Sequence, residues 1–357
     1  MYAGGVPHIC DGMRRHRVRG PHTCEGDVTT RTFSGVQPTG QLHLGNYLGA
    51  IKPWVQHQHE RDNIFCVVDL HALTIPEAVD PKALAARSRS VVASFLAAGI
   101  DPKVSSLFIQ SHVREHSELA WVLNCVTPLG WLERMTQFKS KAGKRAAVGT
   151  GLLDYPVLQA ADILLYDTQV VPVGEDQKQH IELTRDIALR FNNLFGETFV
   201  VPDVSIPPAG ARVMGLDDPT QKMSKSIAQT SPKHAVILLD TPKRIRKTIM
   251  SSVTDSGCEY QPDAASPGVR NLLGILSATS GESVASIAER FEGRGYGYLK
   301  QEVFESLMAD LEPFQATYTR LMDDPTELDA ILARSTERVR SIADATMSRV
   351  RKAVGIG

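Results

Sequence analysis

The sequence predicts an α/β fold, a doubly wound parallel sheet, followed by an all-helical C-terminal domain. From Arg31 to about Val213, short apolar runs alternate with segments of helical periodicity, which is the pattern of successive βα units. Beyond Val213, strand-like runs disappear and apolar residues recur at helical spacing. A chain of 357 residues is long enough for about two such domains. The first domain is therefore expected to be a nucleotide-binding domain of the Rossmann type.

Each element has its own signal in the sequence. Short apolar runs predict strands at 32–35, 64–68, 107–109 and from 170. Helical spacing predicts helices at 47–54 and 84–96, the second ending at Gly99. Further helices are predicted, between proline and glycine breaks, at 237–239, 245–249, 272–276 and 303–311. The last helix has an apolar face that should dock on the body, formed by Val339, Ile342, Ala343, Met347, Val350 and Val354.

Composition excludes several classes of protein. The 39 Lys and Arg nearly balance the 40 Asp and Glu, so the chain is not a general polyanion-coating protein. No apolar run is long enough to span a bilayer. The cysteines are odd in number and scattered, which argues against a disulfide framework and indicates a reducing cytoplasm: Cys10, Cys24, Cys66, Cys125 and Cys258.

Residues 1–30 differ from the rest of the chain. They are rich in Gly, His and Arg and poor in aliphatic residues, which predicts a poorly ordered extension, and they lack the apolar core of a targeting signal. Zinc binding stays open as an alternative, although the spacing matches no common zinc finger, through Cys10, His16, His22 and Cys24.

The segment Pro38-Thr-Gly-Gln-Leu-His-Leu-Gly-Asn46 lies at a predicted strand-to-helix turn, where phosphates are held in dinucleotide-type folds. Gly45 removes a side chain where a purine must lie close to the backbone. His43 and Asn46 are three residues apart and can both point at phosphate or ribose oxygens. A lone histidine at such a turn is more often structural, so a second motif has to support the functional interpretation.

That second motif is Lys222-Met-Ser-Lys-Ser226, on a loop that follows the turn-forming Asp217-Asp-Pro219. Two lysines on long stems suit a pyrophosphate leaving group, which gains charge in the transition state. Such a string alone is typical of any solvated loop. The order, separation and settings of the two motifs predict the halves of one ATP site.

The pair resembles the HIGH and KMSKS signatures of class I aminoacyl-tRNA synthetases. Three intervening segments look like the tryptophanyl-tRNA synthetase family of bacterial type: 134–141, 153–166 and 171–180. The resemblance covers about residues 31–357. It implies activation of tryptophan with ATP, Mg²⁺ held mainly by ATP rather than by the protein, transfer of tryptophan to its specific tRNA, and a symmetric homodimer whose second subunit helps place the tRNA.

The resemblance also assigns roles residue by residue. The cations at the phosphates would be Lys141, Lys222 and Lys225. The other ATP contacts would be Gln37, Thr39, His43, Gly45, Asn46, Asp176, Val213, Met223 and Ser224. The tryptophan pocket would comprise Phe33, His71, Tyr155, Asp162, Val171, Val173, Gly174 and Gln177.

Asp162 projects from an otherwise apolar predicted helix. Pro156 suits the first turn of that helix, which places Tyr155, Gln159 and Asp162 on one face. A buried aspartate needs a partner, and two partners are open: a structural salt bridge, or the indole N–H that the resemblance implies. A site built for an N–H rejects an analogue lacking it by roughly 10⁴–10⁵, so no editing domain against phenylalanine is needed.

The predicted organisation is a catalytic domain at 31–213, the lysine loop and connector at 214–235, a helical region at 236–317 that by resemblance reads the anticodon, and a C-terminal helix at 318–357 that packs back on the body. The chain departs from the family's usual residues at His43, Leu70, Gln159 and Ile227, where the family has threonine, glutamine, methionine and aspartate.

Three other functions stay open. A tyrosine-activating relative is disfavoured by Asp162 and by the string at 174–177. A nucleotidylyltransferase without tRNA is disfavoured by the helical C-terminal region. A non-charging, tryptophan-sensing paralogue is disfavoured by the intact Lys222 and Lys225.

Overall fold

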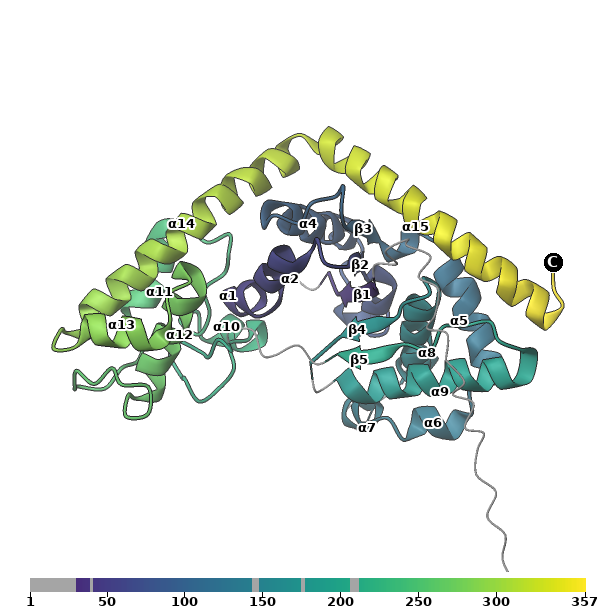
Figure 1. Cartoon of the computed structure of the whole chain (residues 1–357), viewed down its shortest axis with the longest axis horizontal. Coiled ribbons are helices and arrows are strands. Elements are labelled where there is room, and N and C mark those ends of the chain that lie inside the picture. The colour runs from purple at the N-terminus through teal and green to yellow at the C-terminus, as the bar shows by residue number, and fades with distance from the viewer. Residues whose placement is uncertain (1–29, 39–40, 143–147, 175–176, 206–211) are drawn as a thin grey trace, which may run out of the picture.

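A computed structural model describes residues 30–38, 41–142, 148–174, 177–205 and 212–357, without the side chains of residues 140–142. Figure 1 shows a sheet body and a helical lobe, with the long helices α14 and α15 passing over both. The lobe contains α10 to α13 and most of α14, whereas α15 runs along the sheet body.

The sheet has five strands in the order β3-β2-β1-β4-β5, and every neighbouring pair is parallel. The chain runs outward from β1 to β3, then returns to the other side of β1 to add β4 and β5. This order confirms the predicted doubly wound sheet and creates a topological switch point between β1 and β4. The strands are β1 Arg31–Val36, β2 Asp62–Val67, β3 Ser106–Ile109, β4 Val170–Pro172 and β5 Asp203–Ser205.

Both faces of the sheet are covered by helices. Phe65 and Val67 of β2 pack into one apolar cluster, whereas Ile64 and Cys66 of the same strand pack into the other. A strand buried on both faces reads as a continuous apolar run, which is why β2 and β3 could be predicted. The longer helices around the sheet are α4 Leu84–Ala97, α5 Glu115–Val126, α8 Thr150–Leu164 and α9 Lys178–Phe195.

Shorter helical segments connect these elements. Most of them lie between a strand and the next long helix, where they shape the loops at the edge of the sheet. They are α1 Leu44–Asn46, a π-helical turn Tyr47–Ile51, α2 Lys52–His57, α3 Asp69–Ala72, 3₁₀ turns at Pro76–Ala78 and Gln110–His112, α6 Leu129–Glu133 and α7 Thr136–Ala142.

After β5 the described chain is helical, as predicted. The helices are α10 Lys225–Thr230, α11 Pro242–Met250, α12 Pro267–Ser280, α13 Val284–Phe291, α14 Tyr296–Asp323 and α15 Pro325–Val354. The predicted division at 317/318 falls inside α14; the chain bends at Asp324, whose side chain caps α15 by accepting from the Thr326 N–H. The apolar face of α15 is buried against the sheet body, which confirms the predicted docking: Val339, Ala343, Met347 and Val350.

Two local predictions were wrong. The segment 237–239 is not a helix, because it pairs with the chain before α1: the Leu238 N–H donates to the Leu42 carbonyl at 3.0 Å. Pro156 is not in the first turn of its helix, because α8 begins at Thr150 and continues through the proline. In both places tertiary packing overrides the local signal. No helix of the described residues is long and apolar enough to cross a membrane.

Candidate active site

The two sequence motifs meet in the structure. His43, at the start of α1, is only 8% exposed. Burial, and next the positive charges of Lys225 and Lys222, lower its pKa to about 4, from an ordinary 6.5. The lysine loop therefore lies beside the strand-to-helix turn, and the imidazole between them is neutral. Its Nδ1 is buried without a hydrogen-bond partner among the described residues.

The turn that carries His43 is tightly packed. The His43 N–H donates to Oδ1 of Asn46 at 3.2 Å, which fixes the start of the helix. A Cβ on Gly45 would lie 3.1 Å from the His43 ring and 3.6 Å from Cβ of Met223. The missing side chain thus lets the turn, the histidine and the lysine loop approach one another. A π-helical turn follows at Tyr47–Ile51, a feature often found at functional sites.

The lysine loop is anchored by its middle residue. Met223 is 2% exposed, and its N–H donates to the Val213 carbonyl at 3.1 Å. Ser224 caps α10 by accepting from the Ile227 N–H at 3.3 Å. Of the flanking lysines, Lys222 is exposed and Lys225 is half-buried. Burial, together with the charge of Arg87 on α4, lowers the pKa of Lys225.

Asp162, on α8, is the centre of a buried polar network. Its Oδ1 accepts from Nδ1 of His116 at 2.7 Å and from Nε2 of Gln110 at 2.7 Å. Its Oδ2 accepts from Nε2 of His71 at 2.9 Å. The Tyr166 hydroxyl, 2.7 Å from Nε2 of His116, extends the network by one further step.

Asp162 is the acceptor at the centre of these contacts. An ionised carboxylate only accepts, so His116 donates from Nδ1, and its Nε2 shares a hydrogen bond with the Tyr166 hydroxyl. Burial alone would raise the pKa of Asp162, but the interactions with His116 and His71 outweigh it and lower that pKa to about 2. Asp162 is therefore an ionised acceptor, held rigidly inside the protein.

Of the other predicted pocket residues, His71, Tyr155 and Phe33 contact this network or the rings beside it, and the rest follow along β4 and its carboxyl end. The ring of His71 packs edge-on against Tyr155, with centroids 6.3 Å apart, and the Tyr155 hydroxyl lies 2.8 Å from Nε2 of His180. Phe33 stacks on Tyr166 at 5.9 Å. The residues at the end of β4 follow: Val171 is buried, Val173 and Gln177 are half-buried, and Gly174 is exposed.

The remaining predicted residues are placed less completely. Gln37 is exposed directly after β1, and Val213 is buried beside Met223. Thr39, Asp176 and the side chain of Lys141 lie outside the described residues. Four residues that the structure places in these contacts carried no predicted role: Gln110, His116, Tyr166 and His180. Tyr166 is the last residue of the segment 153–166, and His180 is the last residue of the segment 171–180, both of which resemble the family. Gln110 directly follows β3. These positions could have drawn attention to the three residues.

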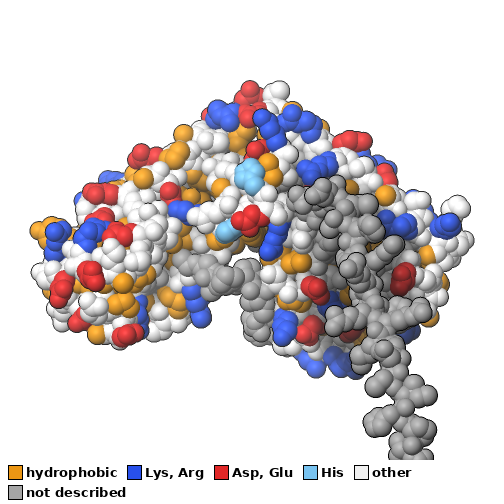
Figure 2. Space-filling view, viewed as in Figure 1, with side chains coloured by type: hydrophobic (Ala, Val, Ile, Leu, Met, Phe, Trp, Pro, Cys, Tyr) orange, Lys and Arg blue, Asp and Glu red, His pale blue; other side chains and the backbone are white. Residues whose placement is uncertain are grey.

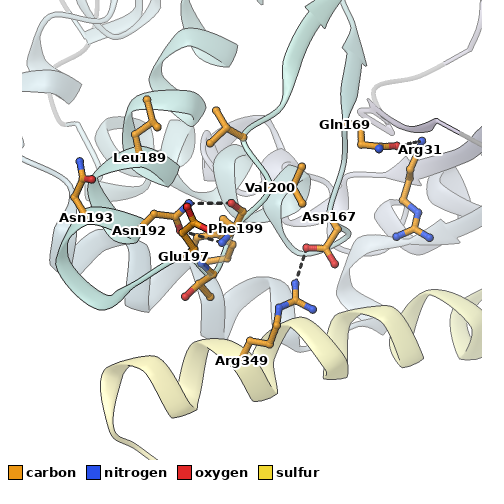
Figure 3. Close-up of a pocket in the computed structure, with 12 residues that line it drawn as sticks. Arg31, Asp167, Gln169, Leu189, Asn192, Asn193, Glu197, Phe199, Val200 and Arg349 are labelled. Carbon is orange, nitrogen blue, oxygen red and sulfur yellow. Dashed lines mark hydrogen bonds and ion pairs between the residues drawn. The ribbon is translucent and has the colours of Figure 1, made fainter. Parts of the chain in front are cut away.

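A hollow of about 740 Å³ lies elsewhere on the protein, and Figure 3 shows it beside α15. Arg31 and Gln169, at the amino ends of β1 and β4, line it. Arg349 pairs with Asp167 across it at 2.5 Å. Open parallel sheets bind ligands at the carboxyl ends of their strands, so this hollow is on the wrong edge to be the active site. Figure 2 shows acidic and basic side chains interspersed over one face of the molecule, in keeping with the net charge of -1.

The sequence matches the family "tRNA synthetases class I (W and Y)" over residues 27–312. The chain belongs to this family. It is 50% identical to a tryptophan–tRNA ligase of Wolinella succinogenes, over 92% of this chain and 99% of that one, and 51% identical to one of Listeria monocytogenes, over 91% and 97%. A crystal structure of tryptophanyl-tRNA synthetase from Campylobacter jejuni, complexed with ADP and tryptophan, is similar at a TM-score of 0.80, with 36% identity over 92% of this chain and 100% of that one.

Proposed function

We propose that the chain is a tryptophan–tRNA ligase. It makes tryptophanyl-adenylate and pyrophosphate from tryptophan and ATP, then transfers tryptophan to the 3′ end of its tRNA. The observation that carries the proposal is the meeting of the His43 turn and the lysine loop, in a chain that also holds a buried carboxylate acceptor and is 50% identical to a tryptophan–tRNA ligase over nearly its whole length.

The negative charge of ATP is complementary to the His43 turn and the lysine loop. Lys222 and Lys225 border a neutral histidine whose Nδ1 has no partner among the described residues, which leaves that atom available to a ligand. The tryptophan carboxylate is already ionised, so activation needs alignment at the α-phosphorus and neutralisation of the pyrophosphate, with Lys141 as a third cation. The described residues hold no cluster of three or more His, Cys, Asp or Glu suited to a metal. Mg²⁺, which neutralises phosphate charge, would arrive on ATP, as the family resemblance implies.

Tryptophan would be selected by Asp162. A carboxylate has about four lone-pair directions, and three donors use three of them here, two on Oδ1 and one on Oδ2. The free direction on Oδ2 can accept the indole N–H, while Phe33, His71 and Val171 wall the ring. The structural salt bridge and the recognition role are thus compatible: His116 and Gln110 hold the carboxylate that the substrate meets.

The ligase would act in the cytoplasm as a homodimer. Trp121 on α5 is 71% exposed, and Cys125, one turn further along, is also exposed. Leu129, at the start of α6, is 58% exposed. Exposed apolar side chains gathered in this way are typical of an interface, and a second copy is the partner that the family resemblance implies. Sedimentation equilibrium of the wild type and of Trp121→Lys tests it, since the variant should dissociate.

The decisive test is amino-acid selectivity. Purified protein should catalyse pyrophosphate exchange with tryptophan and charge tryptophan tRNA. Asp162→Ala should lower kcat/KM for tryptophan about 10–100-fold, the value of one charge-assisted hydrogen bond, and narrow the discrimination against phenylalanine, with ATP affinity retained. Pyrophosphate exchange that depends on tyrosine rather than tryptophan would refute the proposed function. An Asp162→Ala variant that is destabilised but keeps its selectivity for tryptophan over phenylalanine would refute the role of Asp162.

A further inference from the structure

His234 is a buried histidine that the proposed chemistry does not use. It lies after α10, past the end of the lysine loop, and is 1% exposed. Its Nδ1 is 2.6 Å from Oδ1 of Asp217, and its Nε2 is 3.2 Å from the backbone carbonyl oxygen of Lys222. One side chain thus joins the segment before the lysine loop to the first lysine of the loop.

The backbone of His234 is held as firmly as its ring. Its N–H donates to the Ser231 carbonyl at 2.9 Å, and its carbonyl accepts from the Leu216 N–H at 3.0 Å. Asp217 in turn accepts from the Ser231 hydroxyl as well as from His234. These contacts close the chain from 216 to 234 into a loop whose two ends are fixed to each other.

The surrounding residues make room for this ring. A Cβ on Gly215 would lie 2.2 Å from Cε1 of His234 and 2.5 Å from Nδ1, so no other residue fits at 215 without moving the histidine. Both ring nitrogens face acceptors, and a ring protonated on both makes both contacts. Its charge is among those that lower the pKa of His43, which places His234 close to the ATP turn.

We propose that His234, held by Asp217, is a positioning residue for the lysine loop: its contact with the Lys222 carbonyl sets where the Lys222 ammonium stands relative to the pyrophosphate of ATP. The inference rests on the proposed function, which supplies the pyrophosphate. Lys222 is exposed, and the peptide unit that follows its Cα is held at both of its polar atoms: the Lys222 carbonyl faces His234, and the Met223 N–H donates to the Val213 carbonyl.

Two isosteric substitutions separate positioning from packing. The amide nitrogen of Asn takes the place of a histidine Nδ1, and that of Gln takes the place of Nε2. His234→Asn therefore keeps the bond to Asp217 and loses the one to Lys222, whereas His234→Gln keeps the donor toward Lys222. Both replace a buried ring by a neutral amide, so destabilisation common to the two is removed by comparing them.

The measurements are the single-turnover rate of adenylate formation, the tryptophan Kd and the melting temperature. His234→Asn should form adenylate about 3–10-fold more slowly than His234→Gln, the value of one lost hydrogen bond, at equal tryptophan Kd. A matched control is His57→Asn, at an exposed histidine paired with Glu60, which should leave the rate unchanged.

Equal rates in the two His234 variants, or rates that follow the melting temperature alone, would overturn the positioning role. Failure of the proposed function would show differently, as a wild type without tryptophan-dependent exchange. In that case amide hydrogen exchange still decides the contact: the Met223 N–H should exchange faster in His234→Asn than in His234→Gln, and equal protection would refute the inference.

Discussion

His43→Thr offers a test of the electrostatics of the site that needs no substrate. His43 is buried between the lysine loop and the start of α1, and its pKa is lowered to about 4. Threonine is the residue that the family often has at this position, so the substitution removes the titrating group and leaves a side chain suited to starting a helix. We expect the variant to differ from the wild type mainly in how its stability depends on pH.

The sign and size of the expected stability change follow from the linkage between proton binding and folding. In the unfolded chain the imidazole titrates near its ordinary 6.5, whereas in the folded protein it resists protonation down to about 4. As pH falls from 7 to 5, the unfolded state binds a proton that the folded state refuses, so stability is lost through this window. The two pKa values correspond to about 2 kcal/mol of unfolding free energy lost between pH 7 and 5 in the wild type.

Urea unfolding of both proteins at pH 7, 6 and 5 measures this directly. All other titrating groups are shared, so the difference between the two pH dependences isolates His43; the variant should lose about 2 kcal/mol less than the wild type over the range. Lys225→Ala should show a smaller change in the same direction, because burial is the larger cause and the lysine charge the next. If the wild type and His43→Thr lose the same unfolding free energy between pH 7 and 5, His43 is not a buried neutral histidine beside the lysine loop.

Two further predictions concern the loop and the lobe. Lys225→Ala should lower the single-turnover rate of adenylate formation by roughly 10²–10³, as loss of one preorganised donor does, without changing tryptophan affinity in an equilibrium titration. A normal rate with weakened tryptophan binding would mean that the loop is misassigned. Gly268→Ala should destabilise the protein by about 3 kcal/mol in urea unfolding, because its Cβ would lie 2.0 Å from the backbone oxygen of Val253, which cannot rotate away. If Gly268→Ala is as stable as the wild type, α12 is free to shift away from Val253.

The sequence predicted the parts of the fold whose signal is local. β2 and β3 are buried on both faces and read as apolar runs, and the docked face of α15 repeats at helical spacing. β5 was not predicted, because it is a three-residue strand with one apolar side chain, Val204, and forms by pairing with β4. The segment 237–239 has helical composition, but its partner lies almost two hundred residues earlier in the chain.

The same distinction applies to the site. Asp162 could be singled out because an aspartate in an apolar helix needs a partner, yet the identity of its partners depends on packing. Gln110 lies after β3 and His116 at the start of α5, and only the order of the sheet brings both to α8. Sequence distance carries no information about such neighbours, so the network around Asp162 had to come from the structure.

The His43 turn is also mechanically tied to the helical lobe. Nζ of Lys52, on the helix that follows the turn, is 2.8 Å from Oδ2 of Asp310 on α14, and both side chains are about three-quarters buried, with exposures of 21% and 25%. Burial and then the charge of Asp310 raise the pKa of Tyr47 to about 12, which places a third side chain at the same carboxylate. Breaking such a pair would leave an unpaired charge that is largely shielded from water, which costs folding free energy. A rotation of the lobe that keeps this pair intact must therefore carry the His43 turn with it. As long as the pair holds, the region that is proposed to read the tRNA is coupled to the turn that is proposed to hold ATP.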